Sequence, residues 1–283
     1  MPLPCGHLIL DRYRIVSVAG SGGQATVYRA LEETSGETVA VKVAGDADEA
    51  ARLQREGEVL QRLACPRIVG WRDQGYDSSI QGLVLVLDWL PGVLLEEFAS
   101  QVHGRRRDVG RIVMHVAEAL AALHQQGFVM RDLTLTQVMV REQAGEVSAT
   151  LMDLGMLRVL GSYSDLTAPG LVAGTPGFTA PELLLGRAVD ERTDTYSLAC
   201  VAWRLLTGQP PFLGPSPQVT YALQLLGPPD LPKEGITGST PDQDPVLCWL
   251  RSGLAVRPED RPGPPMDWAK GLEERLESDV DGM

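Results

Sequence analysis

The sequence predicts an α+β protein with a small β-rich half and a larger, mainly helical half. Two observations predict this class. Up to about residue 90, apolar residues alternate in short runs, whereas after it they recur at helical spacing, and Pro91-Gly92 interrupts the pattern. The chain has 283 residues, of which 44% are apolar, so it can bury a sizeable core and has the composition of a globular protein.

The first half is predicted to be mainly strands. Its alternating, β-branched runs are Tyr13–Ala19, Ala25–Leu31, Glu37–Val43, Ile68–Tyr76 and Gly82–Asp88. Between the third and fourth runs, Asp46–Leu63 is predicted to be a helix, because apolar residues there recur at spacings of three and four and share one face.

The second half is predicted to be mainly helical. Ile112, Val116, Leu120 and Leu123 mark one long amphipathic helix that ends at Gly127. The remaining predicted elements are two short strands, Gln137–Arg141 and Val147–Met152, a buried helix at Asp194–Leu206 and a loop at Gly227–Pro245.

The charge balance limits the possible partners. The chain has 25 Lys and Arg against 37 Asp and Glu, which gives a net charge of −12. Because such a surface repels a phosphate backbone, we expect no nucleic-acid partner. A single nucleotide is not excluded, since its site needs only a few local hydrogen-bond donors.

Cysteine spacing and apolar runs bear on the compartment. The four cysteines match no zinc or disulfide framework, so a reduced, cytoplasmic protein is expected. The start of the chain does not resemble a signal peptide, and the longest apolar runs are far shorter than the roughly 20 residues of a membrane span. We therefore expect a soluble protein.

Four short segments carry candidate chemistry. The glycine-rich Gly20-Ser21-Gly22-Gly23 lies between two predicted strands and fits either a plain hairpin turn or a loop whose N–H groups bind phosphate. Because a strand follows it, it is not a dinucleotide-binding fingerprint. Lys42, inside an apolar strand, either points to solvent from an edge or pairs with an acid, for which Glu56 on the predicted helix is the candidate.

Two aspartates complete the set. Asp132 lies in an otherwise apolar turn before a short strand, a suitable position for site chemistry. Asp153 ends a strand beside Gly155, a position found both in metal ligands and in plain turns. Each segment alone is a weak signal.

Together, the order and spacing of these segments resemble the protein kinase domain, in particular the eukaryotic-type serine/threonine kinases of bacteria. The resemblance extends from about Leu10 to about Leu276 and includes the run Ala173–Glu182, which is similar to the family's peptide-binding segment. It implies a bilobal fold, with a β-rich N-lobe at 1–90, a helical C-lobe at 91–276 and a short tail at 277–283.

The resemblance implies an ATP site. Its phosphate-binding residues would be Lys42, supported by Glu56, and the backbone of Gly20, Ser21, Gly22 and Gly23. Its adenine-binding residues would be Val27, Ala40 and Met139, together with the hinge that contains Asp88 and Leu90.

The resemblance also implies a catalytic and a regulatory set. Asp132 would orient the substrate hydroxyl and accept its proton, while Asp153 and Gln137 would hold Mg²⁺ or Mn²⁺. Arg131 would receive a phosphate from the activation segment, for which Thr167 is the candidate acceptor; the alternative is that the segment's hydroxyls have no role.

Two departures from the family pattern leave two functions open. Thr134 replaces a lysine that neutralises the transferred phosphate, and Gln137 replaces an asparagine that binds metal. The expected activity is ATP-dependent phosphorylation of Ser or Thr in proteins, at a reduced rate. The alternative is a nucleotide-binding pseudokinase that acts as a scaffold. Either would work with a regulatory protein partner, because the chain shows no sensor domain.

Overall fold

The structure, a computed structural model, describes residues 2–21, 25–102, 105–161 and 174–278. The chain divides into two compact units. The first unit contains Met1–Pro91 and the short segment Asp153–Gly155, and the second contains Gly92–Met152 and Met156–Met283.

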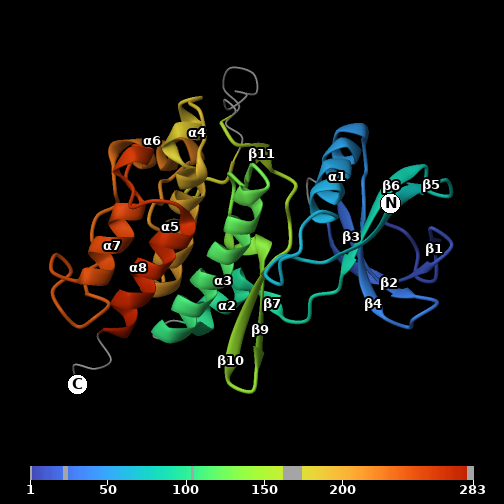
Figure 1. Ribbon diagram of the computed structural model, residues 1–283, viewed down its shortest axis with the longest axis horizontal. Coiled ribbons are helices and arrows are strands. Elements are labelled where there is room, and N and C mark those ends of the chain that lie inside the picture. The colour runs from blue at the N-terminus through green and yellow to red at the C-terminus, as the bar shows by residue number, and fades with distance from the viewer. Residues whose placement is uncertain (1, 22–24, 103–104, 162–173, 279–283) are drawn as a thin grey trace. The chain divides into compact units, whose positions relative to one another are not determined.

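The first unit contains a six-stranded antiparallel sheet in the order β1-β2-β3-β4-β6-β5 (Figure 1). Its strands are β1 (Leu8–Ile9), β2 (Tyr13–Ser21), β3 (Thr26–Glu32), β4 (Thr38–Val43), β5 (Trp71–Asp77) and β6 (Gly82–Asp88). The five strands predicted from the alternation are confirmed, although β5 begins three residues later than predicted.

The alternation of side chains builds the core of this sheet. Tyr28 and Ala30 on β3 face inward with Val39 and Val41 on β4, and all four are at most 2% exposed. The intervening residues of β3 point away from this core, as the period of two requires.

Helix α1 (Ala47–Leu60) packs against β5 and β6. Its N-terminus is capped by Asp46, whose carboxylate accepts a hydrogen bond from the backbone N–H of Glu49 at 2.8 Å. Leu53, Glu56 and Leu60 share its buried face because they are spaced by three and four residues. The predicted helix is confirmed and ends three residues early.

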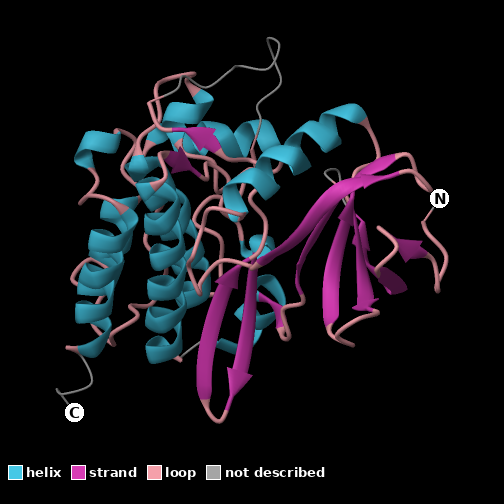
Figure 2. Ribbon diagram, turned by 45° about the vertical axis from the view of Figure 1, so that its right-hand side comes forward, coloured by secondary structure: helices cyan, strands magenta, loops and turns pink. Residues whose placement is uncertain are grey.

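The second unit is mainly helical (Figure 2). Its helices are α2 (Leu95–Val102), α3 (Arg106–Gln125), α4 (Pro181–Leu184), α5 (Glu191–Thr207), α6 (Pro217–Leu226), α7 (Pro245–Gly253) and α8 (Pro265–Glu277), with short 3₁₀ turns at Leu135–Gln137 and Pro258–Asp260. Its strands form two small sheets, one of β7 (Val93–Leu94), β9 (Val138–Gln143) and β10 (Glu146–Leu151), the other of β8 (Phe128–Val129) and β11 (Arg158–Val159).

Helix α5 is central to this unit. It packs against α3, α7 and α8, and most of its side chains are buried, so its apolar residues are not confined to one stripe. The helix is capped by Asp190, which accepts from the N–H of Arg192, and it ends at Gly208 with a φ of 73°. The two predicted helices of this half, α3 and α5, and the predicted loop before α7 are confirmed.

A buried ion pair joins α4 to the segment after α7. Arg261 donates to both carboxylate oxygens of Glu182, at 2.8 and 2.7 Å. Both side chains are at most 1% exposed. The remaining N–H groups of Arg261 reach backbone carbonyls, among them that of Arg192 on α5. The pair therefore holds the segment that carries Glu182 onto the helical core.

No helix in the described part of the chain is both long enough and apolar enough to cross a lipid bilayer.

Replacing Arg261 should destabilise the second unit strongly. Arg261→Met leaves the Glu182 carboxylate buried without a cation, and the loss of one partner of a buried pair costs about 3–5 kcal/mol of the free energy of unfolding. Urea denaturation followed by fluorescence measures this loss. The matched control is Arg257→Met, because Arg257 pairs with Glu259 on the surface and its loss should leave the midpoint unchanged. Equal midpoints for Arg261→Met and wild type would contradict the assignment.

Candidate active site

A buried lysine and two carboxylates form a charged cluster in the first unit. Lys42 Nζ donates hydrogen bonds to Glu56 Oε1 at 2.7 Å and to Asp153 Oδ1 at 3.1 Å. Lys42 is only 9% exposed and Glu56 only 3%. The alternative of a lysine that points to solvent is therefore wrong, and Lys42 pairs with the predicted acid, Glu56.

The local structure brings the three residues together. Lys42 lies on β4, a strand paired on both sides, opposite Val27 of β3 and Leu85 of β6. The buried face of α1 supplies Glu56. The segment Asp153–Gly155, distant in sequence, belongs to the same compact unit.

Burial and charge attraction compete in this cluster. Burial acts to lower the pKa of Lys42, but the negative charges of Glu56 and Asp153 outweigh it and hold that pKa above its ordinary value. For Glu56, burial is the largest effect, and it raises the pKa even though Lys42 acts in the opposite direction. The lysine is therefore firmly protonated, and the cluster contains one more carboxyl group than cation.

Asp153 is the outermost member of the cluster. Its Oδ1 accepts from Lys42 and from the N–H of Gly155 at 3.2 Å, and its side chain is 29% exposed. Within the described residues, its Oδ2 accepts no hydrogen bond, so this oxygen is available to a hard cation. No group of three or more Asp, Glu, His or Cys side chains suited to a metal ion occurs in the described ranges.

The other nucleotide-binding candidates of the first unit lie on its sheet or beside it. Gly20 and Ser21 end β2, while Gly22 and Gly23 lie outside the described residues. Val27 and Ala40 lie on β3 and β4. Asp88 ends β6, donates its N–H to the carbonyl of Gly70 and pairs through its side chain with Arg72. Leu90 follows it outside any strand. Their contacts with a nucleotide stay predictions.

In the second unit, Asp132 is held by a residue 43 positions later in the chain. Thr175 donates its backbone N–H to Asp132 Oδ1 at 2.8 Å and its hydroxyl to Oδ2 at 3.0 Å. Nearby, Tyr221 of α6 donates its hydroxyl to the Gly174 carbonyl at 3.0 Å, and burial together with the charge of Asp132 raises the pKa of Tyr221. The carboxylate of Asp132 is partly exposed and still has lone pairs for a further donor.

A buried carboxylate fixes the backbone just before Asp132. Asp194 of α5 accepts from the N–H groups of Met130 at 2.9 Å and Arg131 at 2.8 Å, and it lies 2.7 Å from His124 Nε2. Arg131 has a φ of 71°, a left-handed conformation that non-glycine residues rarely adopt. Its side chain, the predicted phosphate receiver, is buried, and Thr167 lies outside the described residues.

The loop after Asp132 uses the length of Gln137. Gln137 Oε1 accepts from the N–H of Thr134 at 2.8 Å, and the Thr134 hydroxyl lies 2.9 Å from that of Thr136. Thr134 and Gln137 are 6% and 8% exposed. The amide oxygen predicted to bind metal is therefore engaged within its own loop. Met139, the adenine-binding candidate of this unit, follows on β9 opposite Leu94 of β7.

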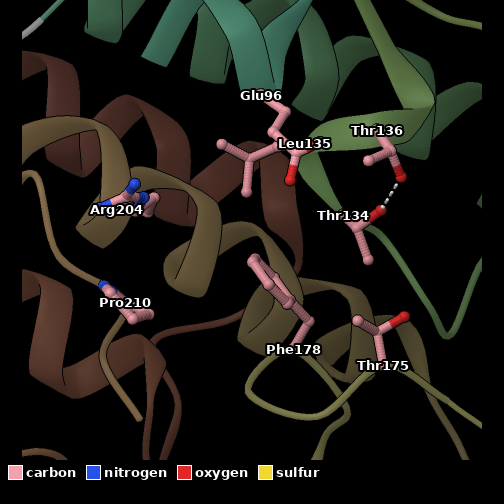
Figure 3. Close-up of a pocket in the computed structure, with 8 residues that line it drawn as sticks. All are labelled: Glu96, Thr134, Leu135, Thr136, Thr175, Phe178, Arg204 and Pro210. Carbon is pink, nitrogen blue, oxygen red and sulfur yellow. Dashed lines mark hydrogen bonds between the residues drawn. The ribbon is translucent and has the colours of Figure 1, made fainter. Parts of the chain in front are cut away.

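A pocket of about 280 Å³ opens beside this loop (Figure 3). Its lining includes three threonines and the apolar Leu135 and Phe178. Two of the threonines, Thr134 and Thr175, belong to the Asp132 loop or contact Asp132 directly. Arg204 of α5 lines the same pocket.

Comparisons with known proteins identify the family to which this arrangement belongs. The family model described as the protein kinase domain matches residues 13–264 of the chain. The chain is a protein kinase domain.

This kinase domain is similar to bacterial serine/threonine-protein kinases. It is 32% identical over 269 residues to the DNA damage-responsive serine/threonine-protein kinase RqkA of Deinococcus radiodurans, covering 93% of this chain and 39% of that protein. It is 33% identical over 270 residues to PkaA of Streptomyces coelicolor, covering 89% and 48%. It is 31% identical over 288 residues to PknF of Mycobacterium tuberculosis, covering 98% and 58%. The chain thus spans between 39% and 58% of these relatives' lengths. The predicted resemblance to bacterial, eukaryotic-type kinases is confirmed.

Sequence reasoning missed two residues of the kinase domain's pocket. Thr175 lies within the recognised segment before Glu182, but nothing in the sequence shows that it reaches Asp132. Arg204 could have been noticed from the sequence, because it is the only cation in the predicted helix Asp194–Leu206.

Removing Lys42 should make stability depend on pH. Lys42→Met leaves two carboxyl groups without their cation, so the pKa of Glu56 rises further. A carboxyl group whose pKa is higher in the folded state stabilises the fold fully below its unfolded pKa and loses this effect as pH rises through the folded value. The loss of unfolding free energy relative to wild type should therefore be larger at about pH 8 than at about pH 5, approaching about 3–5 kcal/mol.

Urea denaturation at both pH values measures this difference. The matched control is Lys270→Met, an exposed lysine of α8, which should show no such pH dependence. A destabilisation of Lys42→Met that is the same at both pH values would contradict the assigned charge cluster.

Proposed function

We propose that this kinase domain transfers the terminal phosphoryl group of ATP to serine or threonine hydroxyls of proteins. The observation that carries the proposal is Lys42, buried and bonded at 2.7 Å to Glu56 and at 3.1 Å to Asp153. A protonated lysine held by two carboxylates is a preorganised cation for phosphate oxygens. The names of the bacterial relatives support protein Ser/Thr hydroxyls as acceptors.

The first unit supplies the charge that positions ATP. Lys42 contacts the phosphates, while Glu56 keeps the lysine in one rotamer and charged. The backbone N–H groups of the glycine-rich segment donate to the phosphates. The adenine contacts are assigned to the apolar side chains and hinge backbone of Val27, Ala40, Asp88, Leu90 and Met139.

Asp132 acts on the acceptor. Its carboxylate accepts a hydrogen bond from the substrate hydroxyl, which orients the oxygen toward the terminal phosphorus of ATP. As the new P–O bond forms and the bond to ADP breaks, the hydroxyl proton passes to Asp132. Thr175 donates to both oxygens of Asp132 and so fixes the plane of the carboxylate.

Magnesium or manganese would neutralise the phosphate charge that Thr134, in place of a lysine, leaves unbalanced. Asp153 fits this role, because its outer oxygen is available and the cluster around it carries one more carboxyl group than cation. Gln137 does not fit as it is arranged, because its amide oxygen accepts from both the N–H and the hydroxyl of Thr134, which together use its two lone pairs. We therefore assign the metal to Asp153 and a structural role to Gln137.

Regulation would act through the segment before Thr175. A phosphate on Thr167, received by Arg131, is the proposed signal, and a regulatory protein would supply the input. The free cysteines support action in a reducing compartment such as the cytoplasm. The bacterial relatives are named as kinases and give no support to the alternative of a catalytically silent scaffold.

Asp132→Asn tests the proposed reaction. The amide still accepts from the N–H of Thr175 but no longer takes a proton, so phosphoryl transfer should fall by a factor of about 10² or more. ATP affinity should stay nearly unchanged, because Lys42 and the glycine-rich segment bind the nucleotide. Transfer of labelled phosphate to generic protein substrates and to the kinase domain itself, with Mg²⁺ and with Mn²⁺, measures the first quantity, and calorimetry measures the second.

Asp190→Asn is the matched control, because asparagine caps a helix as well as aspartate does and this residue only caps α5. Wild-type protein that binds ATP yet transfers no phosphate with either metal would refute the proposed function.

Thr134→Lys should raise the rate. The new ammonium adds the charge that is missing beside the transferred phosphate, and we expect a gain of about tenfold in kcat, a part of the 10²–10³ that one preorganised charge contributes. Thr240→Lys adds the same charge to an exposed threonine in the loop before α7, outside the pocket, and is the matched control. Steady-state kinetics compare them. Equal rates for Thr134→Lys and wild type would contradict the role given to this position.

A further inference from the structure

The pocket beside the Asp132 loop has a direct link to the reacting centre. Thr175 lines the pocket and donates to both oxygens of Asp132, while Thr134 lines it two residues after Asp132. Figure 3 shows Thr134 and Thr175 on one side of the pocket and Arg204 on the other. A peptide whose hydroxyl reaches Asp132 therefore brings neighbouring side chains to this pocket.

Arg204 brings N–H donors to this pocket. It lies in the last turn of α5, is partly buried and donates one N–H to the Gly208 carbonyl. No Asp or Glu of the described residues lies within ion-pair distance of it. An arginine has five N–H donors in a planar fork, so most of this fork remains available to a ligand. Arg261, in the same unit, contrasts with it, because its fork is filled by Glu182 and backbone carbonyls.

The rest of the lining suits a small anionic group. Leu135 and Phe178 supply apolar walls that lower the local dielectric constant, which strengthens a charge interaction. The hydroxyls of Thr134 and Thr136 are hydrogen-bonded to each other, so together they add at most one donor. The pocket volume of about 280 Å³ is enough for a single side chain.

We propose that Arg204 makes this kinase domain prefer substrates with an anionic side chain close to the phosphorylated Ser or Thr. This inference rests on the proposed function. The ligand is the carboxylate of Asp or Glu, or the phosphoryl group of an already phosphorylated residue, since both match the planar donor fork. Arg204 binds the substrate and takes no part in the chemical step.

Two sources of negative charge oppose a preference for anionic side chains, and the assay has to account for both. Glu96 of α2 also lines the pocket and repels an anion, but it is exposed, so water screens its charge. The net charge of −12 repels acidic peptides at low salt. Assays at about 0.15 M salt suppress this long-range effect, because the Debye length is then about 8 Å.

The experiment also has to distinguish anion binding by Arg204 from a purely structural role of this residue. If Arg204 served only to hold the end of α5 through its hydrogen bond to the Gly208 carbonyl, its loss would weaken binding of every peptide equally. The decisive readout is therefore the ratio of kcat/KM between peptides that differ in one charge, not the rate with one peptide.

The experiment uses peptides with one serine in a neutral background. Glu, phosphoserine, Gln or Lys is placed at each position within about four residues of the serine, which is roughly 14 Å of extended chain. For wild-type kinase domain we expect at least one position at which Glu or phosphoserine raises kcat/KM about tenfold over Gln, as a hydrogen-bonded charge does. Whether Glu or phosphoserine gives the larger rise identifies the source of the anion.

Three variants then assign the preference. Arg204→Gln should abolish it while changing kcat/KM for the Gln peptide less than about twofold. Arg204→Glu should reverse it, so that Lys becomes the favoured residue at the same position. Glu96→Gln should act in the opposite direction to Arg204→Gln and increase the preference for the anion. Anisotropy of labelled peptides with Ala in place of the acceptor serine gives the same comparison without phosphoryl transfer.

The outcomes separate this inference from the proposed function. Phosphoryl transfer with no preference for an anion at any position, or a preference that survives Arg204→Glu, overturns the inference and leaves the proposed function standing. Absence of transfer to any peptide or protein overturns the proposed function, and peptide binding then still tests whether Arg204 selects anions. Equal losses for all peptides in Arg204→Gln assign Arg204 a structural role and overturn the inference.

Discussion

The arrangement of the second unit depends on one buried carboxylate. Asp194 is fully buried on α5, so its charge must be satisfied by hydrogen bonds, and it accepts them from the backbone of Met130 and Arg131. These bonds hold Arg131 in a left-handed conformation and so fix the direction in which the chain enters Asp132. Because α5 is packed on several sides, it is a rigid base for the loop, and the same helix presents Arg204 to the pocket two to three turns later.

In the first unit, the important electrostatic feature is the cluster of Lys42, Glu56 and Asp153. The largely buried cluster contains two carboxylates and one lysine, so it carries one excess negative charge if all three ionise. Burial disfavours the charged form of a carboxyl group and raises the pKa of Glu56. Under the proposed function, a cation bound at Asp153 would relieve this excess, since Asp153 is the member of the cluster with an accessible oxygen. The proposed roles follow from these charges: Lys42 would attract a phosphate and Asp153 would attract the metal. An isolated ion pair would have no such residual charge.

The sequence predicted the parts of this molecule that depend on local pattern. Alternation and helical spacing identified five strands of the first sheet and the helices α1, α3 and α5, because each is amphipathic or continuously apolar. An unexpected lysine in an apolar strand led directly to Glu56. The contact between Thr175 and Asp132 was out of reach, because 43 residues separate the partners and no local rule joins them. The hydrogen bond that Gln137 Oε1 accepts from the Thr134 N–H was also missed, because the fold of the loop, and not its composition, sets the direction of the Gln137 side chain.

The hydrogen bond from the Thr134 N–H to Gln137 Oε1 explains how the loop accommodates both departures from the family pattern. In place of a lysine, Thr134 offers a backbone N–H and a hydroxyl on a nearly buried residue, and these groups need partners inside the loop. Gln137, one methylene longer than asparagine, reaches the Thr134 N–H at 2.8 Å and satisfies it. The two residues are thus physically coupled. The loop is held by its own hydrogen bonds. Under the proposed function, the metal and Lys42 would supply the positive charge that a lysine at position 134 would have placed on the phosphate. This arrangement favours a loop that is stable before any nucleotide binds, and under the proposed function we expect a slower chemical step as the consequence.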